Sequence, residues 1–164
     1  ANSFGIVQRG QKLAGMLVFL TDVKALGLDT AKGLQFTTAF YWDRNEESRK
    51  WSQRFFEKHG AMPTMVQAGV YSAVMHYLEA IKASGSDAAA PVRKQLGEME
   101  LNDFFVQNGK IEANGLMSHD MYLAKVKTPE ESESDWDLLD IVSTIPAADA
   151  YIPISESACS LAKQ

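Results

Sequence analysis

Two short apolar runs dominate the hydrophobic pattern of the first third of the chain. The first is MLVFL at residues 16–20, and the second is LQFTTAF at residues 34–40. A continuous apolar run of this length, bounded by turn residues, is typical of a buried strand in a parallel sheet. The pattern therefore predicts strands over residues 12–20 and 34–40 and an α/β fold.

Polar and aromatic residues follow each predicted strand. Thr21 and Asp22 come after the first run, and Tyr41, Trp42 and Asp43 come after the second. In open α/β sheets, ligands bind beyond the carboxyl ends of the strands. These two exits are therefore the first places to look for a binding site.

A helix is predicted directly after the second strand. Asp43 with Glu46 three residues later resembles a capping box, in which Asp43 is the N-cap. Trp51 and Phe55 follow at helical spacing, and Gly60 is a stop signal. We expect this helix to reach residue 58.

The longest predicted helix begins at Pro63 and Thr64 and runs to about residue 83. One stripe of this helix is apolar, and the pattern predicts that it is buried. Gln67 and Tyr71 lie on a neighbouring face, and His76 is expected on the exposed side. The stripe consists of Val66, Val70, Ala73, Val74, Tyr77, Leu78 and Ile81.

The second half of the chain changes its period. Asp87 is expected to cap a third helix that reaches residue 99. Residues 104–126 then read as short strands joined by turns, with two Asn-Gly pairs that favour positive φ. The acidic stretch 128–137 predicts a solvated loop, and residues 138–145 a last strand before an irregular tail.

Composition places limits on function. The chain has 164 residues, 46% hydrophobic and 23% charged, with a net charge of −5. This size allows one domain with a substantial core, and the negative charge argues against nucleic acid as a partner. No apolar stretch approaches the roughly 20 residues that span a bilayer. The chain has no initiating Met and no signal peptide, so we expect a processed, engineered or partial protein.

The first six residues, ANSFGI, read as the last turn of a helix stopped by Gly5, or alternatively as a frayed tail. The helix order is also uneven, since three helices follow two strands and few strands remain to cover them. Both features favour a partial fold.

No catalytic or metal-binding constellation emerges from the motifs. His59, His76 and His119 have no second His or Cys at metal-ligand spacing, so we predict no metal, no cofactor and no catalytic residues. Cys159 is the single cysteine; it is either a free thiol or the partner of a cysteine outside this sequence, the latter requiring an oxidising compartment.

The remaining candidates suit recognition of a small molecule. Phe40, Tyr41 and Trp42 offer a rigid apolar surface with two polar handles, although Phe40 and Trp42 also suit a core position. Thr21 and Asp22 can receive a polar group, although Asp22 can equally cap the turn behind it.

Gln67 and Tyr71 lie near the start of the long helix and can reach the same cleft. Helix–sheet packing with a hydrogen-bonded phenol is the alternative for Tyr71.

The order of these segments carries a resemblance. FLTDVKALG is followed by GLQFTTAFYWD, a helix ending in EKHGAMPT, the helix AGVYSAVMHYLEAI and the late hairpin KIEANGLMSHDMYLAKVK. This order resembles the periplasmic solute-binding proteins of ABC importers, of the class I leucine/isoleucine/valine-binding type. The resemblance covers the C-terminal part of that family and implies an incomplete fold with parts of two doubly wound lobes.

The resemblance implies a lobe for each part of the chain. Residues 1–39 would belong to the C-terminal lobe, 40–118 to the N-terminal lobe, and 119–164 to the C-terminal lobe and tail. The N-terminal part of the same protein would complete both lobes. The protein would be periplasmic, and lobe closure around the ligand would signal to a membrane permease.

The resemblance also implies ligand contacts in the loop Thr21–Val23, in the crossover Phe40–Trp42 and at the helix start Met65–Gln67. Together with the residue pattern, this predicts a ligand-binding set of Thr21, Asp22, Val23, Phe40, Tyr41, Trp42, Gln67 and Tyr71. Relatives that bind branched-chain amino acids receive the ligand ammonium on a glutamate at the position of Val23. With Val23 there, the sequence looks similar to the branch that takes up aromatic carboxylates. We therefore expect a small carboxylate ligand, either an aromatic acid or a branched-chain amino acid.

Two other classes of function stay open at this point. A ligand-sensing domain of a receptor or regulator would have the same fold, and a fused output segment would distinguish it from an importer component. A small enzyme is disfavoured because the sequence shows no acid–base pair.

Overall fold

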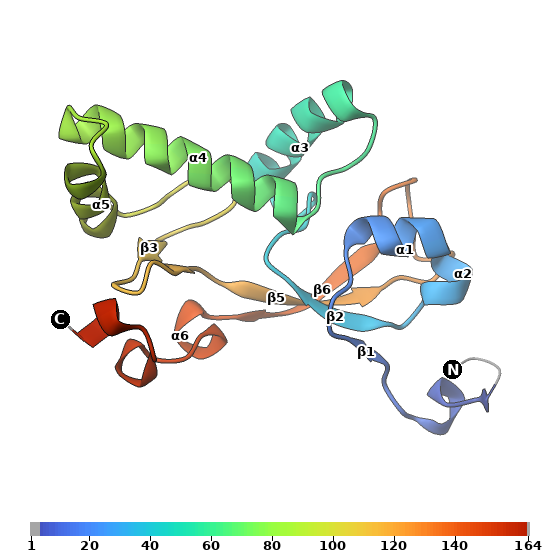
Figure 1. The fold of residues 1–164 in the computed structure, drawn as a ribbon. Coiled ribbons are helices and arrows are strands. Elements are labelled where there is room, and N and C mark those ends of the chain that lie inside the picture. The colour runs from blue at the N-terminus through green and yellow to red at the C-terminus, as the bar shows by residue number, and fades with distance from the viewer. Residues whose placement is uncertain (1–3, 164) are drawn as a thin grey trace. The chain divides into compact units, whose positions relative to one another are not determined.

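The computed structural model describes residues 4–163 and has a mixed α/β fold (Figure 1). Contacts within the chain define two units. The first unit comprises Ala1–Met65 and Tyr122–Thr144, and the second comprises Val66–Met121 and Ile145–Gln164. The chain passes from one unit to the other at three places, so each unit is built from separate segments. Of the predicted helix end at the N-terminus, residues 1–3 lie outside the described residues, and Gly5 has the positive φ of 62° that a helix stop needs.

The first unit is organised on a four-stranded sheet in the order β1-β2-β5-β6. β1 (Ala14–Gly15) is parallel to β2 (Gln35–Thr38), and β5 (Met121–Val126) is antiparallel to β2. β6 (Leu139–Ile145) forms the far edge. The predicted second and last strands are therefore confirmed.

The prediction for the first apolar run is mostly wrong, because only Ala14–Gly15 of residues 12–20 forms a strand. Leu20 begins a helix instead, α1 (Leu20–Leu26), which is followed by the short α2 (Leu28–Ala31). The backbone N–H of Phe19 donates to the carboxylate of Asp22 at 2.8 Å, which fixes the start of α1. Met16 and Leu17 are left 95% and 74% exposed.

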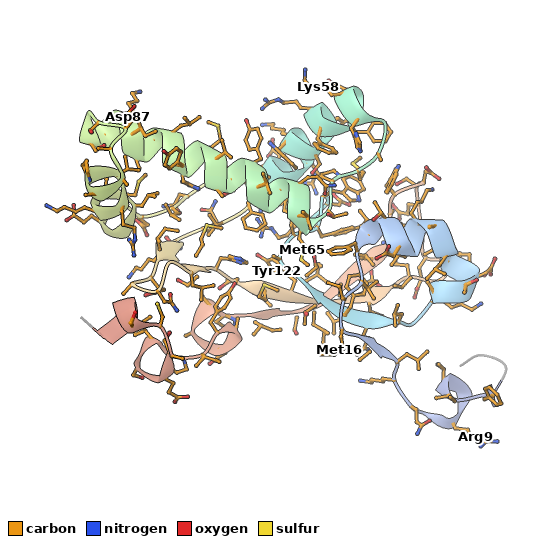
Figure 2. The ribbon with its side chains drawn as sticks, in the orientation of Figure 1. Arg9, Met16, Lys58, Met65, Asp87 and Tyr122 are labelled. Atoms are coloured by element: carbon orange, nitrogen blue, oxygen red, sulfur yellow. The ribbon has the colours of Figure 1, made fainter. Side chains whose placement is uncertain are left out.

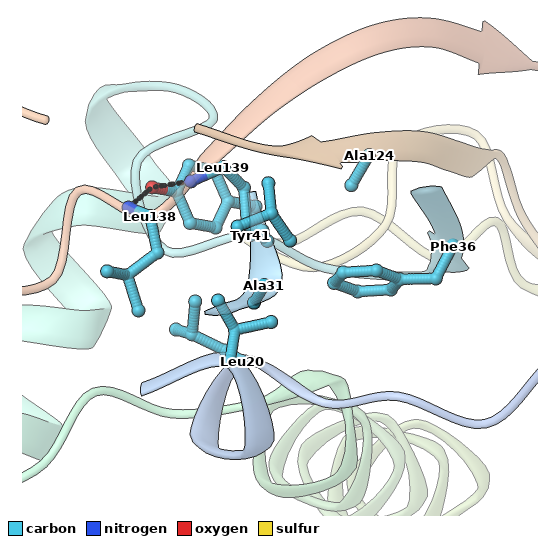
Figure 3. Packing of buried hydrophobic residues seen from close by; sticks show 9 residues of the cluster. Leu20, Ala31, Phe36, Tyr41, Ala124, Leu138 and Leu139 are labelled. Carbon is cyan, nitrogen blue, oxygen red and sulfur yellow. Dashed lines mark hydrogen bonds between the residues drawn. The ribbon is translucent and has the colours of Figure 1, made fainter. Parts of the chain in front are cut away.

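The core of the first unit lies between the sheet and α1 (Figure 3). Its side chains come from both ends of the unit's sequence. Their burial therefore depends on the pairing of β2 with β5, which lie far apart in the chain. The cluster consists of Leu20, Val23, Ala31, Phe36, Tyr41, Ala124, Val126, Leu138 and Leu139.

α3 (Glu46–His59) confirms the predicted helix but has a different N-cap. Asn45, not Asp43, accepts the N–H of Ser48 at 2.9 Å, because Asn45 has the extended backbone that an N-cap requires. The Asp43 carboxylate instead pairs with Arg49 at 2.8 Å. Gly60 ends α3 with a φ of 78°, as expected.

α4 (Met65–Ser84), whose first residue Met65 is labelled in Figure 2, lies within two residues of its predicted bounds, but the face that it buries is not the predicted one. The residues that it buries are Ala68, Ser72, His76 and Ala80. The apolar stripe that was predicted to be buried is largely exposed, and His76 is buried rather than exposed. The period of the sequence defines which residues share a face, but a neighbour decides which face is covered.

The rest of the second unit is made of short elements. α5 (Ala89–Glu98) follows Ala88 rather than the predicted cap Asp87. β3 (Lys110–Ile111) and β4 (Met117–Ser118) form the late hairpin, whereas the predicted strand at residues 104–106 is absent. Both Asn-Gly turns adopt positive φ, at Asn108 (54°) and at Gly115 (86°).

The tail after β6 is not wholly irregular. It contains the single turns α6 (Ala147–Ala150), η3 (Ile154–Glu156) and η4 (Ser160–Lys163). At the other end of the chain, η2 (Val7–Arg9) precedes β1. Among the described helices, none has the length and apolar composition to cross a membrane.

Candidate functional site

The exits of β1 and β2 lie at the same edge of the sheet, because the two strands are parallel. Thr21 and Asp22 are exposed on the first turn of α1. The Asp22 carboxylate already accepts the N–H of Phe19 at 2.8 Å, so its role as a helix cap is established by geometry. Of the two residues, Thr21 is therefore the better candidate for a hydrogen bond to a ligand, through its hydroxyl group.

Val23 lies on the inner side of α1. Its side chain has no exposed surface and belongs to the hydrophobic core. A fully buried side chain cannot contact a ligand directly. Val23 can affect the site only by positioning α1 on the core.

Phe40 and Tyr41, at the exit of β2, are also buried. Phe40 is 3% exposed and packs edge-on against Trp51, with ring centroids 5.9 Å apart. Tyr41 is 4% exposed. Phe40 therefore occupies the core position that the sequence analysis gave as its alternative.

The Tyr41 hydroxyl is a hydrogen-bonding centre for the end of the acidic loop (Figure 3). It accepts the backbone N–H groups of Leu138 at 3.2 Å and Leu139 at 3.4 Å, and it donates to the carbonyl of Trp136 at 3.4 Å. Burial raises the pKa of the Tyr41 phenol well above its ordinary value of 10.0, so the hydroxyl stays protonated.

Trp42 keeps part of its ring accessible. Its indole Nε1–H donates to the same Trp136 carbonyl at 2.8 Å, and the side chain is half-buried. Trp42 is thus the aromatic residue at this exit that combines a fixed orientation with free surface, as a stacking platform requires.

A charged pair closes the acidic loop at its base. Lys127 Nζ donates to both carboxylate oxygens of Asp137, at 2.6 and 2.8 Å. Burial opposes both charges, but the hydrogen bond and charge of Asp137 raise the pKa of Lys127. For Asp137 burial is likewise outweighed, here by the Glu133 N–H and by Lys127, and its pKa is lowered.

A polar hollow of about 420 Å³ opens beside this pair within the first unit. The Arg44 guanidinium borders it and donates to the hydroxyl of Tyr122, lying 5.0 Å from the centre of that ring. Three carboxylates face two cations that both have protein partners, so the hollow is poorly suited to an anionic ligand. It is lined by Tyr41, Asp43, Arg44, Tyr122, Lys127, Asp137, Leu139, Asp140, Ile141 and Thr144.

Sequence reasoning missed the charged residues around this hollow. Arg44 lies two residues after Trp42, and this closeness to the aromatic segment was an available signal. Lys127 and Asp137 carried no local signal, because their pairing depends on how the loop returns to β6.

Gln67 and Tyr71 lie one helical turn apart on α4, in the second unit. Both are exposed, and the Tyr71 ring packs against Phe104 with centroids 5.8 Å apart. Tyr71 therefore packs against a neighbouring ring, as the alternative reading of this residue expected, but it also keeps exposed surface. A common cleft with the residues of the first unit stays a prediction.

One Ser/His/Asp group is brought together in the second unit. Ser72 Oγ lies 3.3 Å and Asp103 Oδ2 3.9 Å from the same ring nitrogen, His76 Nδ1. Ser72 has no exposed surface. A nucleophilic triad needs the serine and the carboxylate on opposite ring nitrogens and an accessible hydroxyl, so this group is structural.

The described residues contain no group of three His, Cys, Asp or Glu side chains that fits a metal ion. Cys159 is a free, half-buried thiol in this structure. Its pairing with a cysteine outside this sequence stays a prediction.

Comparisons with known proteins identify the family. The sequence profile described as "Periplasmic binding protein" matches residues 1–133. The chain therefore belongs to the periplasmic binding protein family, and its fold is part of a class I fold of that family. No match is found among curated protein sequences.

Solved structures support the same assignment. A periplasmic binding protein from Burkholderia mallei is 44% identical, with a TM-score of 0.89, over 98% of this chain and 42% of its own. A branched chain amino acid ABC transporter periplasmic ligand-binding protein from Burkholderia xenovorans LB400 is 40% identical, with a TM-score of 0.94, over 99% of this chain and 43% of its own. The chain thus spans less than half the length of these proteins.

A more distant structure shares the fold alone. The solute binding protein of an ABC transporter from Rhodopseudomonas palustris BisB5, solved in complex with 3,4-dihydroxy benzoic acid, is 18% identical with a TM-score of 0.67. The match covers 89% of this chain and 40% of that protein.

Proposed function

We propose that this chain is part of an extracytoplasmic solute-binding component of an ABC importer. The whole protein captures a small carboxylate between two hinged lobes and delivers it to a membrane permease without transforming it. The family match over residues 1–133, together with two structures 40–44% identical, carries the proposal.

The lobe assignment is part of this proposal. Residues 1–39 and 119–164 belong to one lobe, and residues 40–118 to the other. Support comes from the three places at which the chain passes between its two compact units, since interwoven lobes require such crossings. The unit boundaries differ from the proposed lobe boundaries at two places: residues 40–65, which include α3, group with the sheet of the first unit, and residues 145–164 group with the second unit.

We further propose an aromatic carboxylate as the ligand, with a branched-chain amino acid as the alternative. Val23 is apolar and buried where the resemblance implies a glutamate for an ammonium group, so an amino acid would lose its charge partner there. A relative with the same fold was solved with 3,4-dihydroxy benzoic acid, which supports the aromatic class. The name of the Burkholderia xenovorans relative supports the alternative.

Thr21 and Trp42 carry most of the proposed contact on the first unit. Trp42 offers a half-exposed ring held by Trp136, and Thr21 an exposed hydroxyl. Asp22 would act mainly by fixing the start of α1, while Val23, Phe40 and Tyr41 would support the contacting residues from the core. Gln67 and Tyr71 would contribute from the second unit.

Isothermal titration of the full-length protein tests the ligand class. We expect benzoic or cinnamic acid to bind and leucine not to bind; tight leucine binding would overturn the aromatic assignment. Absence of binding to every carboxylate tested would overturn the proposed function as a whole.

Substitutions at Trp42 test the proposed contact. Trp42→Ala should weaken binding by about tenfold, since aromatic contacts contribute about 0.5–1.5 kcal/mol beyond burial. Trp42→Phe keeps an aromatic ring and loses only the bond to Trp136, so it should retain most of the affinity. Thr30→Val on α2, at an exposed position of the same unit, is the control.

A further inference from the structure

Lys24 joins α1 to the end of the acidic loop (residues 128–137) through three contacts. Its Nζ donates to the backbone carbonyl of Asp135 at 2.8 Å and also to the carboxylate of the same residue. The same ammonium lies 5.3 Å from the centre of the Trp136 ring, which is within the range of a cation–π contact. We call Lys24, Asp135 and Trp136 the Trp136 junction. All three residues belong to the first unit.

The next carbonyl along the chain, that of Trp136, orients the indole of Trp42. It accepts the Trp42 Nε1–H at 2.8 Å, the Leu138 N–H at 3.0 Å and the Tyr41 hydroxyl at 3.4 Å. A carbonyl oxygen has two lone pairs, so the two shortest bonds, from Trp42 and Leu138, are the stronger ones. The position of this carbonyl thus decides the orientation of the Trp42 ring.

The same hydrogen bond limits what Trp42 offers to a ligand. An indole has a single N–H donor and no acceptor, and the Trp136 carbonyl already uses that donor. The accessible part of the half-buried ring therefore presents carbon atoms, which suit the aromatic or aliphatic part of a ligand and not its carboxylate. The part of the ligand that Trp42 receives thus depends on the loop that carries Trp136.

Two groups of contacts restrain this end of the loop. Lys127 and the Tyr41 hydroxyl bond to residues 137–139, next to the sheet. Lys24 bonds to residues 135–136 from α1. The loop also carries five carboxylates, and the Lys24 ammonium lowers their mutual repulsion. Removing this ammonium should therefore loosen residues 135–136 while residues 137–139 stay in place.

We propose that Lys24, Asp135 and Trp136 are positioning residues of the candidate ligand site. By joining the loop to α1, they keep the Trp136 carbonyl where it directs the Trp42 ring toward the apolar part of the ligand. They act through Trp42 and make no contact with the ligand themselves. This inference rests on the proposed function and adds to it the residues that orient the aromatic contact.

Hydrogen exchange of the Trp42 indole tests the junction without any ligand. Proton–nitrogen NMR of the full-length protein follows the Nε1–H signal, which is assigned by its loss in Trp42→Phe. We expect Lys24→Met to speed exchange about threefold to fivefold, which is what a partly exposed ion pair contributes to such an opening. Lys24→Arg keeps the cation and should restore slow exchange. Lys32→Met, at an exposed position after α2, is the control and should leave the rate unchanged. Unchanged exchange in Lys24→Met would overturn the proposal.

A double-mutant cycle separates positioning from a general loss of stability. Isothermal titration of the full-length protein with benzoic acid is the measurement. Lys24→Met should weaken binding about threefold when Trp42 is present, and by less than about 1.5-fold in Trp42→Ala, where no ring remains to be oriented. Equal weakening in both backgrounds, or none in either, would overturn the proposal. If benzoic acid does not bind the wild type, the proposed ligand class fails, and the exchange measurement decides whether the junction orients Trp42.

Discussion

Removing one oxygen from Tyr41 should destabilise the first unit measurably. In Tyr41→Phe the ring stays in the core, but the N–H of Leu139 loses its acceptor at 3.4 Å and the Trp136 carbonyl loses a donor. The N–H of Leu138 loses less, because it also points at the Trp136 carbonyl, 3.0 Å away.

The magnitude follows from these contacts. A buried N–H left without an acceptor costs about 1–3 kcal/mol, and the Trp136 carbonyl keeps the Trp42 indole as donor. We therefore expect a loss of about 2 kcal/mol in the free energy of unfolding. For a chain of this size that corresponds to a decrease in Tm of about 4–8 °C.

Scanning calorimetry of the purified chain is the assay, with Tyr77→Phe as the matched control. Tyr77 is 46% exposed, so the same chemical change should cost less than about 0.5 kcal/mol. An unchanged Tm in Tyr41→Phe would refute the assignment of the hydroxyl to the loop. A change confined to ligand affinity would instead return Tyr41 to the binding surface.

Two further predictions concern charge and capping. The lowered pKa of Asp137 means that its contribution to stability is present above its ordinary pKa of 3.8 and is lost as the pH falls through the lower folded value. Urea midpoints of Asp137→Asn should therefore fall less steeply than those of the wild type as the pH is lowered from 5 to 2; identical profiles would contradict the pairing with Lys127. At the start of α3, Asn45→Ala should cost about 1 kcal/mol because Ser48 loses its cap, whereas Asp43→Ala, which breaks only a partly exposed ion pair, should cost about 0.5 kcal/mol or less. Urea unfolding ranks the two variants, and the reverse order would restore Asp43 as the cap.

Local signals in the sequence predicted approximately where the three longest helices, α3, α4 and α5, begin and end. Gly60 defined the end of α3, and Pro63 with Thr64 placed the start of α4 within two residues. Asn45 was missed because Asp43 with Glu46 also satisfies the spacing of a capping box, and only the backbone conformation separates the two.

The first apolar run shows why strand and helix are hard to separate in short segments. Residues 16–20 are apolar throughout, and a run of this length has no distinguishing period. Leu20 is buried as the first residue of a helix, while Met16 and Leu17 are exposed in the loop before it.

The position of the candidate site stays a prediction, and the structure shows which of its residues keep accessible surface. The second apolar run ends at the exit of β2, whereas the first run follows β1 and leads into α1; Thr21 and Trp42 retain accessible surface. The burial of Tyr41 depends on backbone groups almost 100 residues later in the chain, for which no local pattern exists. Long-range contacts of this kind decide whether an aromatic residue at a strand end meets the ligand or the core.

The placement of the three tryptophans has a practical consequence for spectroscopy. Trp42, Trp51 and Trp136 all belong to the first unit, and the Trp42 indole donates to the backbone carbonyl of Trp136. Indole emission excited at the red edge of the ultraviolet band thus reports on that unit, whereas melting of α5 or the β3–β4 hairpin would pass without a direct optical signal. A tryptophan introduced into the second unit would allow unfolding of that unit to be followed by fluorescence as well.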